Sequence, residues 1–96
     1  MMTFSLVLIS VLLNFGPAET ARAAFEMGNY SAAVKAATAA LAGGQQDASL
    51  HYWALRSYYE LHDYEKAITH GEQAVKLDPS NAEYNQWLGR AYGERA

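Results

Sequence analysis

Cysteine is absent from the 96-residue sequence, and proline occurs only twice. Without cysteine there are no disulfide bonds, thiolate zinc sites or thiol nucleophiles, and the redox compartment stays undetermined. Positive charge is also scarce, because 7 Lys and Arg stand against 10 Asp and Glu, for a net charge of -3. Nucleic acid demands a basic surplus, so we expect no nucleic-acid partner. Hydrophobic residues nevertheless make up 51% of the chain, which favours a small packed domain over disorder.

The longest apolar run extends from Phe4 to Leu13 and is too short to cross a bilayer comfortably. Helix-breaking and small residues follow it at 16–18, as they do at the cleavage point of a signal peptide. We therefore expect residues 1–18 to be a signal peptide cleaved after Ala18, in a protein that a bacterium exports to the periplasm or secretes. Residues 1–3 carry no Lys or Arg, so two alternatives stay open: a retained membrane anchor and a cytoplasmic protein with a misread start.

The sequence repeats itself at an offset of 34 residues, the spacing from Arg22 to Arg56 and from Arg56 to Arg90. Other identical residues fall in register at this offset without a gap: Glu26/Glu60/Glu94, Tyr30/Tyr64, Ala33/Ala67, Ala40/Ala74, Ala48/Ala82, Trp53/Trp87 and Tyr58/Tyr92. A period of this length indicates a stacked array of one supersecondary unit.

Each unit is predicted to contain two helices, because apolar and small residues recur at three- and four-residue steps. In the middle unit the first such face comprises Leu50, Trp53, Ala54, Ser57, Tyr58 and Leu61, and the second comprises Tyr64, Ala67, Ile68, Gly71, Ala74, Val75 and Leu77. Residues 78–81 contain a proline and three side chains that cap helices, so one helix ends there and the next begins. The pattern predicts an all-α array of helical hairpins, packed closely at Ala33, Ala40, Ala67 and Ala74.

These residues resemble the tetratricopeptide repeat family, whose pattern runs W-x-x-L-G-x-x-Y, then Ala, an aromatic or small residue, Ala and Pro. The middle block matches at Tyr58, Tyr64, Ala67, Ala74 and Pro79, and the last block matches at Trp87, Leu88, Gly89 and Tyr92. The first block keeps Gly28, Tyr30, Ala33 and Ala40. The resemblance implies a solenoid of two antiparallel hairpins (about 19–47 and 48–81) and the first helix of an incomplete third (82–96).

Three features depart from the family pattern. Ala54-Leu55 inverts the usual Leu-Gly pair and puts a bulky side chain where a small one is expected. His62 replaces the usual glycine of the intrahairpin turn, where a left-handed backbone is needed that histidine tolerates. The array also stops within its third repeat, so we expect Trp87, Leu88, Ala91 and Tyr92 to lack the helix that would cover them.

Catalytic and metal-binding motifs are missing from the sequence. His51, His62 and His70 are spaced too irregularly along two helices to suggest a metal site, and we expect structural or surface roles for them. Gly43-Gly44 is followed by Gln45-Gln46 and does not form a phosphate-binding loop. No nucleophile motif is present, so we expect no enzyme activity, cofactor or metal.

One polar pattern repeats: each Arg of the 34-residue series precedes a Glu by four residues, which is side-chain contact distance on a helix. A solvated ion pair within the helix would explain this spacing without any function. In the resembling family, however, these first helices line a concave groove that grips peptides, and there the arginines would contact acidic groups of a partner. The family's dicarboxylate clamp uses Lys and Asn, which this sequence lacks at those places. The groove candidates are Arg22, Phe25, Glu26, Tyr52, Arg56, Tyr59, Glu60, Gln86, Arg90 and Glu94.

The function expected from this pattern is non-catalytic binding of a protein, as a peptide or a partner helix on the concave face. One alternative is a structural role in which the exposed third-repeat helix pairs with a second copy as a homodimer. Another is a regulatory fragment of a larger enzyme.

Overall fold

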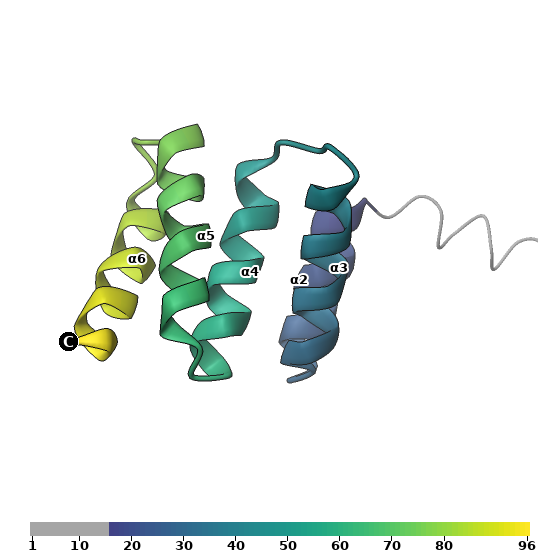
Figure 1. Cartoon of the computed structure of the whole chain (residues 1–96). Coiled ribbons are helices and arrows are strands. Elements are labelled where there is room, and N and C mark those ends of the chain that lie inside the picture. Colours follow the sequence, from purple (N-terminus) through teal and green to yellow (C-terminus); the bar gives the residue numbers. More distant parts are fainter. Residues whose placement is uncertain (1–15) are drawn as a thin grey trace, which may run out of the picture.

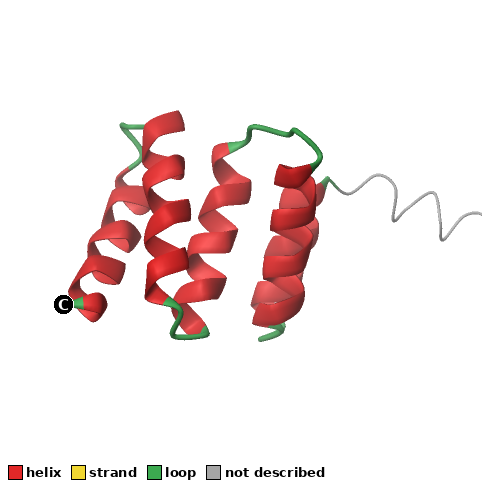
Figure 2. Cartoon of the chain, viewed as in Figure 1, coloured by secondary structure: helices red, strands yellow, loops and turns green. Residues whose placement is uncertain are grey.

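The structure is a computed structural model that describes residues 16–96. This part of the chain forms five α-helices: α2 (Pro17–Glu26), α3 (Tyr30–Ala42), α4 (Ala48–Glu60), α5 (Tyr64–Leu77) and α6 (Ala82–Arg95). Figure 1 shows α4, α5 and α6 side by side, with the α2–α3 pair at one end and the C-terminus at the other. Loops connect the helices, and no strand occurs among residues 16–96 (Figure 2). The predicted all-α array of two hairpins and one further helix is confirmed.

Four of the five described helices, α3 to α6, begin at side chains that cap their free N–H groups. The carboxylate of Asp47 accepts from the Ser49 N–H at 2.9 Å, and that of Asp63 accepts from the Lys66 N–H at 3.3 Å. Asn29 and Asn81 cap α3 and α6 in the same way, each at 3.1 Å. Pro17 occupies the first turn of α2, where its missing N–H costs nothing. These caps fix the starts of α3 to α6, and Asn81 lies in the capping segment 78–81 that the sequence predicts.

The turn inside each hairpin has the same geometry in both repeats. After α2, the N–H of Asn29 donates to the Ala24 carbonyl at 2.9 Å; after α4, the N–H of Asp63 donates to the Tyr58 carbonyl at 2.9 Å. This pattern requires a left-handed residue between helix and turn. Gly28 supplies it with a φ of 78° and His62 with a φ of 63°, as predicted.

Small residues make up most of the fully buried core. Ala33, Ala67 and Ala74 are 0% exposed, as predicted. The inverted Ala54-Leu55 pair is accommodated because the small residue lies on the facing helix. Leu55 is fully buried, and a Cβ atom at Gly71 of α5 would lie only 3.3 Å from its Cδ1 atom. The large residue of this contact therefore lies on α4 and the small residue on α5, and the two helices remain closely packed.

Several predicted burials are wrong. Leu61 and Leu77 are each 43% exposed, because Leu61 lies in the turn beyond α4 and Leu77 ends α5. The third-repeat helix is also better covered than expected. Ala91 is fully buried, and Trp87 and Leu88 pack on the core that α4 and α5 form, because the inner side of α6 faces those helices; only Tyr92, at 38%, stays exposed.

The predicted signal peptide lies largely outside the described residues, since only Gly16, Pro17 and Ala18 of it are included, at the start of α2. None of the helices in residues 16–96 is long and apolar enough to span a membrane.

Candidate functional site

Two adjoining hollows lie on the face that the first helices α2, α4 and α6 share. The larger has a volume of about 410 Å³, and its lining residues are Arg22, Phe25 and Glu26 from α2, Tyr52, Trp53 and Arg56 from α4, and Glu83 from α6. The smaller, of about 170 Å³, shares Arg22 and Trp53 with it and adds Ala18, Glu19 and Ser49. The two together are named the first-helix groove below, and the smaller one is named the Trp53 hollow.

Aromatic rings form the bottom of the groove. The Trp53 ring lies 5.4 Å from Phe25 of α2 and 4.9 Å from Tyr52 of its own helix, centroid to centroid. Tyr52 in turn stacks on Tyr84 of α6 at 4.8 Å. Tilted and offset rings at such distances attract each other beyond their area burial, so these contacts hold the three first helices together.

Arg56 is the most enclosed charged side chain of the groove, with only 18% of its side chain exposed. Its guanidinium carbon lies 3.9 Å from the centre of the Trp87 ring and 4.7 Å from that of Phe25. Its Nη1 atom donates to the Tyr52 hydroxyl at 2.6 Å and lies 3.9 Å from Oε1 of Glu83. The guanidinium thus joins α2, α4 and α6, by cation–π contacts and by polar bonds.

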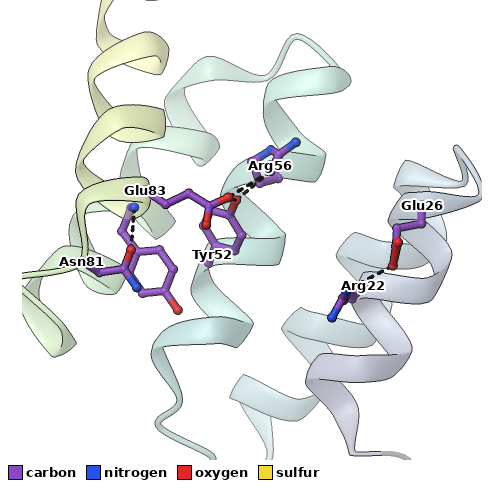
Figure 3. A network of polar contacts seen from close by, with 7 residues as sticks. Arg22, Glu26, Tyr52, Arg56, Asn81 and Glu83 are labelled. Carbon is purple, nitrogen blue, oxygen red and sulfur yellow. Dashed lines mark hydrogen bonds and ion pairs between the residues drawn. The ribbon is translucent and has the colours of Figure 1, made fainter.

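Glu83 reaches from α6 toward α4 and completes this network (Figure 3). The Tyr52 hydroxyl donates to its Oε1 atom at 2.5 Å while accepting from Arg56. Burial and the bond to the Glu83 carboxylate raise the pKa of Tyr52 to about 12, so the phenol stays protonated and remains a donor. Asn81, the cap of α6, fixes the start of the helix that carries Glu83.

Only one of the three repeated Arg–Glu pairs forms as an ion pair within its helix. Arg22 Nε lies 3.0 Å from Glu26 Oε1, and the two side chains are 61% and 57% exposed. Arg56 instead pairs with Glu83, and the guanidinium carbon of Arg90 lies 4.5 Å from the centre of the Trp87 ring. The spacing of four residues permits the intrahelical pair, but Arg56 stacks on rings of the neighbouring helices α2 and α6, and Arg90 stacks on Trp87 of its own helix.

The structure brings five of the ten predicted groove residues to the larger hollow: Arg22, Phe25, Glu26, Tyr52 and Arg56. Tyr59 and Glu94 lie farther along the face and meet at 3.4 Å, and Arg90 lies over Trp87. Glu60 and Gln86 line neither hollow. The sequence analysis did not place Glu19, Trp53 and Glu83 in the groove. Helical spacing carried a signal for Glu83, because it precedes Trp87 by four residues and Arg90 by seven.

Comparison with known proteins identifies the family of this chain. A model of the tetratricopeptide repeat family matches residues 19–82 and again 54–92. The chain belongs to the tetratricopeptide repeat family. A search of curated proteins found no match. Members of this family generally mediate protein–protein interactions and are generally not catalysts, and the groove lies on the first helices of the tetratricopeptide hairpins.

A second polar feature of this tetratricopeptide protein lies between the two helices of the middle repeat. His51 of α4 and His70 of α5 approach to 3.0 Å between their Nδ1 atoms, and the Tyr58 ring stacks on His70 at 5.6 Å. The sequence analysis assigned both histidines structural or surface roles but missed this contact. Among residues 16–96, no three metal-ligating side chains gather at one point. The two Nδ1 atoms are at hydrogen-bond distance, so that one ring donates to the other, which requires at least one neutral imidazole.

The histidine pair should make the fold sensitive to acid. Burial and the neighbouring His51 lower the pKa of His70 to about 4, and burial lowers the pKa of His51 although Asp47 acts in the opposite sense. The unfolded chain binds a proton at His70 below pH 6.5, whereas the folded chain resists protonation until about pH 4. The contribution of His70 to stability is therefore complete above pH 6.5 and is lost as the pH is lowered toward 4. Because His70 is only partly buried, solvent screening reduces this loss to an amount on the order of 2 kcal/mol.

Urea unfolding of the protein at several pH values between 7 and 4 measures this effect. His70→Gln should flatten the pH dependence, whereas His62→Gln, at an exposed turn residue, should leave it unchanged. An unchanged slope in His70→Gln would show that other groups cause the acid sensitivity.

Proposed function

We propose that this chain is a non-catalytic binding module that holds an extended peptide or a helix of a partner protein in the first-helix groove. The observation that carries this proposal is the groove itself, which three consecutive first helices line with aromatic and charged side chains. Its volume of about 410 Å³ falls in the range of ligand-binding clefts. Because the hairpins pack through buried alanines, the helices that carry the groove residues are already in place, which lowers the ordering cost of binding.

A photo-crosslinking experiment in the expressing cell tests this function. Position 22 lines both hollows, so a benzoylphenylalanine residue placed there lies in the groove. Position 65 lies on α5, outside both hollows, and serves as the control. We expect a covalent adduct with a partner protein from position 22 and none from position 65. No adduct from position 22, or equal adducts from both positions, would overturn the assignment of the groove.

Self-assembly through the third-repeat helix has less support than the sequence suggested. Ala91 is fully buried within the chain, and Leu88 lies close to Gly71 of α5, so the apolar side of α6 is largely covered. A homodimer through this helix would therefore bury little further apolar surface, which a stable interface needs.

We also infer that the protein is exported, on the basis of the apolar run and the small residues up to Ala18. A cut after Ala18 keeps Ala21, which is 0% exposed, and the groove residue Arg22. N-terminal sequencing of protein recovered from an exporting bacterial host should begin at or near Glu19. Intact Met1 in the soluble cytoplasmic fraction would refute the inference.

A further inference from the structure

The two junctions between successive first helices are related by the 34-residue repeat but are filled differently. At the second junction, Arg56 of α4 lies 3.9 Å over Trp87 of α6. The equivalent residues at the first junction are Arg22 of α2 and Trp53 of α4. Arg22 does not stack there, because it pairs with Glu26 of its own helix at 3.0 Å and is 61% exposed.

The residues that hold Arg56 in place explain this difference. Its guanidinium is bound by the Tyr52 hydroxyl and by the Glu83 carboxylate. One repeat earlier, the equivalent positions are Ala18 and Ser49, which offer neither a phenol nor a carboxylate. Arg22 therefore lacks the phenol and the facing carboxylate that hold Arg56 over its ring, and it pairs with Glu26 instead.

The Trp53 hollow is the space left open because Ala18 and Ser49 occupy the positions that Tyr52 and Glu83 occupy in the next repeat. In the uncleaved chain its lining consists of Ala18 and Ser49, which stand in the places of the two acceptors, together with Glu19, Arg22 and Trp53. It is therefore the equivalent, one repeat earlier, of the slot that the Arg56 guanidinium fills. Cleavage after Ala18 would remove Ala18 and leave the other four residues around the hollow. Trp53 also lines the larger hollow, so it can be reached from the whole groove.

The charges around the groove also favour a cation. The lining carries three negative charges, from Glu19, Glu26 and Glu83, and two positive charges, from Arg22 and Arg56. The Arg56 charge is enclosed by aromatic rings. The Glu26 and Glu83 side chains are 57% and 61% exposed, against 18% for Arg56. An incoming cation would meet accessible carboxylates, and the face of an indole attracts cations most strongly among the aromatic rings.

We propose that the Trp53 hollow binds an arginine side chain of the partner protein, whose guanidinium stacks on Trp53 in the way that Arg56 stacks on Trp87. The proposal rests on the function proposed above and names the chemistry of the partner. It reverses the expectation from the sequence that the repeated arginines contact an acidic partner.

A nuclear magnetic resonance titration tests the proposal with a defined probe, Nα-acetyl-arginine amide. Its control is Nα-acetyl-citrulline amide, which has the same shape but no charge. We expect the indole N–H signal of Trp53 to shift in a saturable way, with an affinity for the arginine probe about fivefold or more above that for the citrulline probe. The signal of Trp87 should move little, because Arg56 and Arg90 already lie over its ring.

Three charge variants sharpen the test. Glu19→Gln should weaken binding of the arginine probe about two- to fivefold. Glu26→Gln should weaken it at least as much, because it also releases Arg22 to compete for Trp53. Glu65→Gln changes the charge equally on α5, outside the groove, and should have no effect.

The outcomes separate this proposal from the general function. No shift at Trp53, equal shifts with both probes, or larger shifts at Trp87 would overturn the arginine site. If a partner still crosslinks from position 22, the groove binds a protein by other chemistry. If the arginine probe binds at Trp53 but position 22 yields no adduct, the hollow is selective for a guanidinium while the proposed function fails.

Discussion

Replacing Ala67 by leucine is expected to lower the free energy of unfolding by about 1 to 3 kcal/mol, because Ala67 is fully buried where α4, α5 and α6 meet. Three further heavy atoms have no space there, since Leu55, Ile68 and Ala91 of the same core cluster are all at most 3% exposed. In a domain of this size, each kcal/mol corresponds to a fall of roughly 4 to 8 °C in the melting temperature. Thermal unfolding followed by circular dichroism measures the change.

Lys66→Leu is the matched control, because it introduces the same side chain at the preceding position of α5. Lys66 is 64% exposed, forms a 3.8 Å ion pair with Asp63, and has its Nζ atom 5.7 Å from the centre of the Tyr58 ring. Its replacement should change stability by no more than about 0.5 kcal/mol. Equal losses in both variants would show that the buried face of α5 is wrongly assigned.

Replacing Arg56 by alanine should destabilise the fold by about 2 kcal/mol, although this position is one of three that appear alike in the sequence. The substitution removes the side chain that packs between Phe25, Trp87 and Tyr52, and leaves a void between three helices. It also takes away the donor that the Tyr52 hydroxyl accepts from. Chemical denaturation with a constant m-value would measure the loss.

Arg22→Ala is the control for this prediction. Its ion pair with Glu26 is exposed and lies within one helix, so its loss should cost only about 0.3 to 0.5 kcal/mol. If both arginine variants lose equally little, the Arg56 side chain is solvated and does not join the helices. An Arg56→Lys variant should fall between the two, because lysine keeps the charge but lacks the planar group that stacks on Trp87.

These stability effects bear on how the groove is to be tested. A variant that removes Arg56 changes the fold and the groove together, so a loss of binding would be ambiguous. Arg22, Glu19 and Glu26 line the groove from exposed positions and report on binding alone. They are therefore the better positions for functional substitutions.

The amino-acid sequence by itself determined the number, order and pairing of the helices. The 34-residue offset showed the repeat. The capping residue Asn81 and the left-handed His62 are local signals, because a helix start or turn depends on the few residues around it. The small buried residues Ala33, Ala67 and Ala74 were also predictable, since a recurring alanine at helical spacing marks a close contact. Leu61 and Leu77 were misplaced because exposure at a helix end depends on where the chain turns.

Only the tertiary structure decided which of the repeated residues act alike. Arg22 and Arg56 share a spacing of four residues to a glutamate, yet one is 61% exposed and the other 18%. The difference arises from Tyr52 and Glu83, which face Arg56, and from Ala18 and Ser49, which stand in their places near Trp53. The contact between His51 and His70 likewise joins residues from two helices of one hairpin. Such contacts depend on the relative positions of neighbouring helices, and the spacing within a single helix carries no information about them.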